Sequence, residues 1–167
     1  SRAEIRIMLR TMGYRPRAPI RTVSQAAAAA FLLSLRTGMR AGEITGLTWD
    51  RVHDRHIVLT VTKTTPREVP LSRKARRVVE KMRGFDVARV FGLTPQTLDA
   101  LFRRYRQRAG LDGFTFHDAR HTAATWIGRS GVIGLPELCR MFGWKNPAQA
   151  MVYFNARAAD IADKLDR

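Results

Sequence analysis

The chain has a single cysteine, Cys139, among its 167 residues, so it cannot form an intrachain disulfide. It contains no apolar run of the roughly 20 residues that a membrane-spanning helix needs, and its start shows no signal-peptide pattern. We therefore expect neither a disulfide-stabilised scaffold nor a membrane-spanning protein. A reducing cytoplasmic setting fits the lone thiol.

Acidic residues are also scarce. Asp and Glu number 14 against 30 Lys and Arg, which gives a formal net charge of +16. Such an excess of one sign costs self-repulsion and predicts a polyanionic partner, of which double-stranded DNA is the first candidate. An anionic membrane surface fits less well, because the basic residues are spread over several predicted elements rather than along one amphipathic helix.

The 45% hydrophobic fraction is enough to bury a core in a domain of ordinary size. Helical spacing of apolar residues, with capping residues before it and glycines after it, recurs along most of the chain. The period changes to two between Val52 and Leu71, which predicts short strands joined by turns at 53–56 and 62–66. We expect an α+β fold, mainly α: a helical bundle with a small three-stranded antiparallel sheet.

Three further helices are predicted in the C-terminal half of the chain. One spans about His117 to Arg129, a second runs from Glu137 to Phe142, and a third opens at Asn146-Pro147 and carries Tyr153. His117 and Arg120 lie three positions apart, so they share one face of the first helix. A guanidinium placed near a close-packed helix start needs an anion, because an unpaired buried charge is expensive.

Each candidate residue also has a structural interpretation. His117 could be a core histidine, and Arg120 could pair with Glu43 or Asp118. His117 and His121 are spaced like the histidines of a zinc-protease H-E-x-x-H motif. However, Asp118 stands where that motif has glutamate, no third ligand is evident, and Arg120 would place a cation beside the metal. We therefore expect no metal.

Taken together and in this order, four segments resemble the conserved boxes of one family: Thr37–Glu43, Thr62–Leu71, His117–Thr122 and Phe142–Tyr153. The chain resembles the catalytic domain of the tyrosine recombinases, the phage integrase family, over nearly its whole length. The resemblance implies that residues 1–167 form a single catalytic domain, and that the N-terminal core-binding domain of the family is absent from this chain.

The resemblance implies the roles of the site residues. Tyr153 is the nucleophile, which attacks a DNA phosphate to form a 3′-phosphotyrosine without ATP, metal or any other cofactor. Arg40 and Arg120 hold the non-bridging oxygens of that phosphate. His117 accepts or relays the tyrosine proton, and Lys63 protonates the leaving 5′-oxygen.

Two further positions follow from the same resemblance. Most members have histidine where this chain has Trp144, whose indole N–H can donate a hydrogen bond but cannot carry a proton. Glu43 is expected to orient the arginine–histidine cluster from behind.

The implied function is that of a site-specific DNA recombinase or integrase in the cytoplasm of a prokaryote, associated with the nucleoid and encoded there or by a phage. It would act as a homo-tetramer on DNA, docking Ala158–Leu165 on a neighbour, and could be a monomer as an isolated domain. Two alternatives stay open. One is a type IB topoisomerase-like strand relaxation, and the other is a non-catalytic basic DNA-binding module whose tyrosine is structural.

Overall fold

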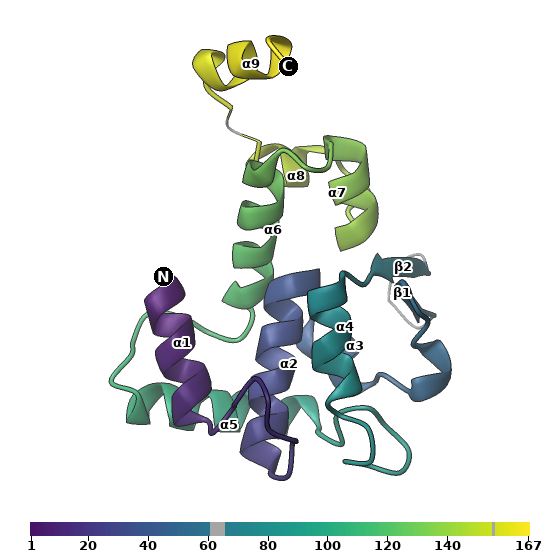
Figure 1. The fold of residues 1–167 in the computed structure, drawn as a ribbon, viewed down its shortest axis with the longest axis vertical. Coiled ribbons are helices and arrows are strands. Elements are labelled where there is room, and N and C mark those ends of the chain that lie inside the picture. Colours follow the sequence, from purple (N-terminus) through teal and green to yellow (C-terminus); the bar gives the residue numbers. More distant parts are fainter. Residues whose placement is uncertain (61–65, 155) are drawn as a thin grey trace.

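The computed structural model describes residues 1–60, 66–154 and 156–167. The chain is mainly helical, with one small sheet whose strands come between the third and fourth α-helices in chain order and lie beside the fourth in space (Figure 1). In chain order the elements are α1 (Arg2–Thr11), α2 (Val23–Thr37), α3 (Ala41–Thr45), the 3-10 turn η1 (Trp49–Arg51), β1 (His56–Leu59), β2 (Arg67–Pro70), α4 (Arg73–Glu80), α5 (Pro95–Arg108), α6 (Asp118–Ser130), α7 (Leu135–Phe142), α8 (Ala148–Met151) and α9 (Ala158–Leu165).

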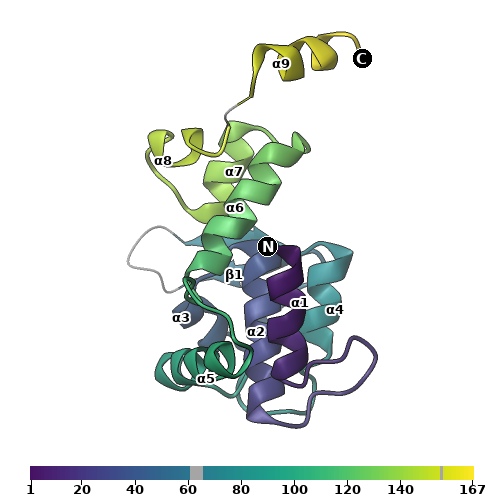
Figure 2. The same ribbon diagram turned by 90° about the vertical axis from the view of Figure 1, so that its left-hand side faces the viewer.

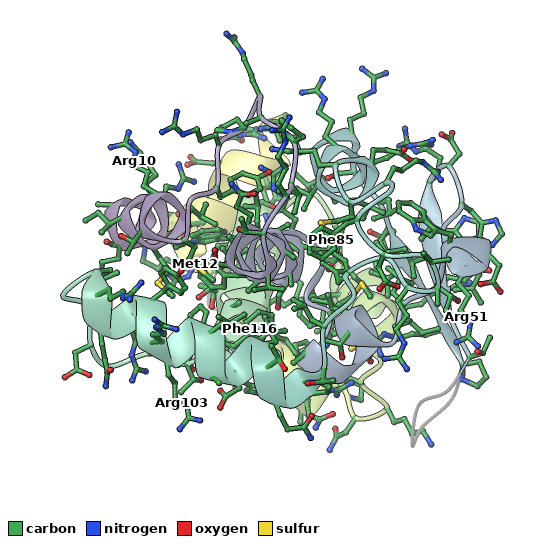
Figure 3. All side chains as sticks on the ribbon, turned by 90° about the horizontal axis from the view of Figure 1, so that it is seen from below. Arg10, Met12, Arg51, Phe85, Arg103 and Phe116 are labelled. Carbon is green, nitrogen blue, oxygen red and sulfur yellow. The ribbon has the colours of Figure 1, made fainter. Side chains whose placement is uncertain are left out.

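Helix α2 is the centre of the larger part of the molecule, and α1, α4 and α5 surround it (Figures 1 and 2). It can be surrounded because it is apolar on nearly all sides: the alanines at positions 26–30 are all fully buried. Small side chains let neighbouring helices approach closely, while Phe31 fills the larger gaps by packing on Phe102 and Phe116. Seen from below, Met12 and Phe116 lie inside this bundle, whereas Arg10 and Arg103 lie at its edge (Figure 3).

The end of α2 positions the first part of the candidate site. Gly38 adopts a left-handed conformation, with φ of 71°, which stops the helix and turns the chain into α3. The same residue lies against the ring of Phe142, and a Cβ on Gly38 would stand 2.3 Å from that ring. Arg40 follows two residues later, at the start of α3. Because Gly38 packs directly on the Phe142 ring, the turn between the two helices has little freedom to move, and the backbone of Arg40 is held in place.

The sheet is smaller than predicted. In the described residues β1 and β2 form an antiparallel pair, with Ile57 opposite Val69, and Val52 contributes only an isolated bridge to Ile57. The expectation of three strands is thus wrong, because the chain around Val52 turns directly from η1 and makes one bridge rather than a ladder. The predicted turn at residues 62–66, which carries Lys63, lies outside the described residues except for Pro66.

Helices α6, α7 and α8 stand above this bundle and have a small core of their own (Figures 1 and 2). Its largest fully buried side chain is Phe142, which packs with Leu138 and the alanines of α6. The predicted helix over Tyr153 is shorter than expected: α8 ends at Met151, and Tyr153 follows it in a turn closed by a hydrogen bond from its own N–H to the carbonyl of Ala150.

Helix α9 projects away from the rest of the chain, next to the C-terminus (Figures 1 and 2). None of its residues is buried, and its apolar side chains Ile161 and Leu165 are 49% and 82% exposed. No described helix has the length and apolar character needed to span a bilayer.

Candidate active site

Arg40, His117 and Arg120 line one hollow of about 260 Å³. Arg40 comes from the turn after α2, whereas His117 and Arg120 come from the start of α6, about 80 residues later in the sequence. A hollow of this size has room for a phosphate group, since a water molecule takes about 30 Å³ of liquid volume. The structure therefore brings together three of the residues that the sequence singled out.

Arg120 is the most unusual residue of the hollow. Its side chain is only 4% exposed, and its guanidinium donates hydrogen bonds of 2.6 Å to the carbonyl oxygens of Gly38 and Phe142. No carboxylate pairs with it in the described part of the chain, so the expected alternative of a pair with Glu43 or Asp118 is not what the structure shows. A buried guanidinium whose hydrogen bonds go to neutral carbonyl groups keeps an uncompensated positive charge, which an anion would balance.

Burial and neighbouring cations act on the ionisation of this residue. Desolvation, followed by the charges of Arg40 and Arg67, lowers the pKa of Arg120 to about 10. At neutral pH the guanidinium is still charged. A bound anion would relieve both the desolvation and the like-charge repulsion.

Glu43 lies behind Arg40 and is shared by two arginines. Its carboxylate accepts hydrogen bonds of 2.5 and 2.9 Å from Arg67 and pairs with Arg40 at 3.2 Å. Burial raises the pKa of Glu43, but the hydrogen bonds from Arg67 and from the Arg40 backbone outweigh burial, so the pKa is lowered overall. The carboxylate of Glu43 thus anchors Arg40, whose side chain remains 45% exposed and accessible to a ligand.

Arg67 was not among the predicted site residues. It is buried, and besides pairing with Glu43 its Nε donates to the carbonyl of Met141 at 3.2 Å. A signal for it existed in the sequence: in Arg67-Glu68-Val69-Pro70 the period of two places Arg67 on the same inward face as Val69. An arginine on the buried face of a strand needs an acidic partner, and Glu43 is that partner.

Three aromatic rings, those of Phe142, Trp144 and Tyr153, stack in sequence next to Arg120. The guanidinium lies 4.8 Å from the ring centre of Phe142 and 5.6 Å from that of Trp144. Trp144 stacks on Phe142 on one side and on Tyr153 on the other, where the ring centres are 5.5 Å apart and the planes differ by 3°. The position of Trp144 therefore sets the position of the tyrosine ring.

The Tyr153 hydroxyl lies 2.9 Å from Nδ1 of His121. No such contact joins Tyr153 to His117 among the described residues, although the rings of His117 and His121 meet edge to face at 5.0 Å. Burial, followed by the charges of His121 and Arg120, lowers the pKa of His117. In the described ranges no group of three or more His, Cys, Asp or Glu residues is arranged to hold a metal ion.

Comparison with known proteins agrees with this geometry. The chain matches the phage integrase family over residues 4–160, and it belongs to that family. It is 32% identical over 139 residues to a shufflon-specific DNA recombinase of Escherichia coli, a match that covers 81% of this chain and 36% of that protein. The chain spans 30% to 50% of the length of this recombinase and of two putative integrase/recombinases of Haemophilus influenzae that it also matches.

Two solved structures share the fold. The catalytic domain of bacteriophage HP1 integrase has a TM-score of 0.74 at 20% identity, covering 99% of this chain and 92% of that one. A lambda integrase tetramer bound to a Holliday junction has a TM-score of 0.73 at 19% identity, covering 95% of this chain and 48% of that one. The helical architecture with a small sheet is therefore the fold of tyrosine recombinase catalytic domains.

Proposed function

We propose that this chain is the catalytic domain of a site-specific DNA recombinase or integrase that cleaves and rejoins DNA through a 3′-phosphotyrosine. The observation that carries the proposal is Arg120: a buried guanidinium without a carboxylate partner in the described residues, in a hollow shared with Arg40 and connected by stacked rings to Tyr153. A phosphodiester supplies the missing anion, and the nearby phenol supplies a nucleophile for it.

The proposed reaction begins when Tyr153 Oη attacks the phosphorus of a bound phosphodiester. The new Oη–P bond forms as the P–O5′ bond breaks, and the O5′ atom takes a proton and leaves as a 5′-hydroxyl. One phosphodiester bond is exchanged for another, so no ATP is needed. Arg40 and Arg120 bind the non-bridging oxygens, whose charge they stabilise as the transition state forms. Arginine suits this task because its planar fork stays charged and donates in pairs.

The remaining groups handle protons and orientation in the proposed scheme. His117 lines the same hollow as both arginines and relays the tyrosine proton. Lys63, outside the described residues, protonates the leaving 5′-oxygen. Trp144 donates a hydrogen bond from its indole and supports the tyrosine ring, and Glu43 holds Arg40 from behind.

The proposed partner is double-stranded DNA, on which the chain works as a homo-tetramer. Support comes from the charge of +16 and from the family relationship to a recombinase and to an integrase solved as a tetramer on a Holliday junction. Helix α9, with its exposed Ile161 and Leu165, is the proposed segment for docking on a neighbouring subunit. Such a protein works in the cytoplasm of a prokaryote, at the nucleoid.

A suicide-substrate experiment tests the proposal. The substrates are duplexes that carry candidate attachment sites and a nick close to the cleavage position. Cleavage releases a short fragment that carries the 5′-hydroxyl, and its diffusion prevents rejoining and leaves the protein covalently attached. We expect the wild-type protein to form the adduct, Tyr153→Phe to form none while binding the same DNA, and Tyr105→Phe on α5 to behave as wild type. An adduct with Tyr153→Phe would place the nucleophile elsewhere, and adduct formation that EDTA abolishes would indicate a metal-dependent reaction.

The role of Lys63 has its own test on the same substrate. Lys63→Ala should cleave slowly, and a bridging 5′-phosphorothiolate should restore cleavage, because a thiolate leaves without protonation. Failure of the phosphorothiolate to rescue would assign the leaving-group proton to another residue.

A further inference from the structure

The hydroxyl of Tyr153 has one described partner, and it is not the histidine that the family resemblance assigns to proton transfer. That partner is Nδ1 of His121, at 2.9 Å. His121 lies in the first turn of α6, one residue after Arg120, and its side chain is on the exposed side of the helix. Two segments 32 residues apart thus meet at the proposed reacting atom.

The tyrosine ring is held from other directions as well, so the contact with His121 is a defined one. Trp144 stacks against one face of the ring in nearly parallel planes. The backbone of Tyr153 lies so close to α6 that a Cβ on Gly128 would stand 2.9 Å from its carbonyl oxygen. With the backbone and the ring plane fixed, the hydroxyl is directed at the imidazole.

We propose that His121 is a further catalytic residue, which orients the Tyr153 hydroxyl and accepts its proton as the phosphotyrosine forms. This inference rests on the proposed function of the chain. The two histidines then have different roles. His117 lines the hollow in which the phosphate would bind, together with Arg40 and Arg120. His121 contacts the hydroxyl of the nucleophile.

The chemistry balances with groups that the proposal already names. In the proposed step the phenol of Tyr153 donates to the lone pair on Nδ1 of His121, which requires the imidazole to carry its proton on Nε2. As the bond from Oη to phosphorus forms, the phenolic proton moves to Nδ1, the P–O5′ bond breaks, and the 5′-oxygen takes a proton from the general acid. Rejoining returns the proton from His121 to the tyrosine.

The imidazole of His121 contacts side chains from two segments. The ring of His117, at the start of the same helix, lies edge-on to it at 5.0 Å. Tyr153, from the turn after α8, reaches its Nδ1.

The first test needs no DNA and so is independent of the proposed function. With protein labelled with ¹⁵N at histidine, NMR reports the state of each imidazole nitrogen, and a His121→Asn variant identifies the His121 signals. We expect Nδ1 of His121 to be the unprotonated, hydrogen-bonded nitrogen, and we expect Tyr153→Phe to shift it while leaving His53, in a distant turn, unchanged. A His121 Nδ1 signal that does not respond to Tyr153→Phe overturns the inference.

The second test measures the chemical step with saturating suicide substrate in a single turnover. His121→Ala should slow adduct formation about 100-fold, the lower end of what a positioned acid–base group contributes. His121→Asn should be slowed about 10-fold, because its amide oxygen can accept the hydrogen bond but not the proton. DNA affinity should stay within about twofold of wild type in both variants. A slower chemical step with unchanged DNA affinity is not what a loss of the folded structure would produce. His53→Ala serves as the matched control.

The outcomes separate the two proposals. If the wild-type protein forms no adduct, the proposed function fails and the NMR experiment still decides whether the contact exists. If the wild-type protein forms the adduct and His121→Ala matches its rate, the function stands and the role of His121 is wrong. A wild-type rate in His121→Asn alone would overturn proton acceptance by His121.

Discussion

The two halves of the candidate site rest on cores of very different size. The part built on α2 and its neighbours buries a large continuous core, which holds Arg40 and Glu43. The part built on α6, α7 and α8 has a small core around Phe142, and it holds Trp144 and Tyr153. Arg120 spans the two, because one of its hydrogen bonds goes to Gly38 in the first part and the other to Phe142 in the second.

This difference in core size indicates which part of the site is rigid and which part can move. A small core contributes little stability alone, so the second part depends on its attachment to the first. Arg67, Arg120 and the contact of Phe142 with Gly38 make that attachment. We therefore expect the phosphate-binding arginines to be more rigidly placed than the tyrosine, and this can be tested by weakening each attachment.

The largest loss of stability is expected from Arg67→Met. The change leaves the buried Glu43 carboxylate with only the more exposed Arg40 as a partner and removes the hydrogen bond to Met141. Breaking one side of a buried ion pair costs about 3–5 kcal/mol. Urea unfolding at pH 7 measures it.

The matched control for that prediction is Arg83→Met, which breaks an exposed pair with Glu80 and should leave the unfolding midpoint nearly unchanged. The double change Arg67→Met with Glu43→Leu should recover part of the loss, since no carboxylate is then buried without a partner. If Arg67→Met costs no more than Arg83→Met, the two parts are not joined through Arg67.

Gly38→Ala should have the next largest effect. The new Cβ would be forced to 2.3–2.4 Å from two atoms of the Phe142 ring, at a backbone φ of 71° that alanine rarely adopts. Gly84→Ala is the matched control, because its φ is 79° and nothing lies within 4 Å of its Cβ position. We expect a loss of about 1 kcal/mol for the control and about 3 kcal/mol for Gly38→Ala.

The comparison of those two glycines isolates the contact between the cores. Equal losses in the two variants would mean that Phe142 moves aside without cost. A larger loss for Gly38→Ala, accompanied by slower adduct formation, would show that the contact also positions Trp144 and Tyr153.

Acid should weaken the attachment through Glu43. Its pKa in the folded protein is lowered below the ordinary value of 4.5, so its stabilising contribution is present above about that pH and is lost as the pH falls through the folded pKa. The difference in unfolding free energy between wild type and Glu43→Gln should therefore shrink between pH 6 and pH 3. A difference that stays constant over this range would contradict the ionised pair.

Gly128→Ala should change stability least and still affect the reaction. Alanine favours a helix interior by about 1 kcal/mol over glycine, but here its Cβ would press on the Tyr153 backbone at 2.9–3.0 Å. The two effects oppose each other, so we expect little net change in the unfolding free energy and slower adduct formation, because the tyrosine shifts from His121. An unchanged rate would show that the tyrosine tolerates displacement.

Much of the fold followed from local chemistry. Residue spacing and capping predicted the helices well, because α2 has a hydroxyl cap at Thr22 and a glycine at its end, and α9 appears at the predicted residues. The alternating pattern near Val52 predicts a third strand, but in the described residues it forms only one bridge, to Ile57, and no ladder. The helix end before Tyr153 was misjudged because nothing in the local sequence marks Met151 as its last residue.

The sequence by itself determined the residue types of the site, their order and the strong positive charge, because these depend only on composition and spacing. Only the tertiary structure decided which side chains contact one another. Arg120 donates to carbonyl oxygens rather than to a carboxylate, and Glu43 pairs with Arg67. The hydroxyl of Tyr153 contacts His121 rather than His117. The reason is that these contacts join segments 22 to 82 residues apart. Side-chain partners at such separations are set by how the two cores pack, which no local pattern encodes.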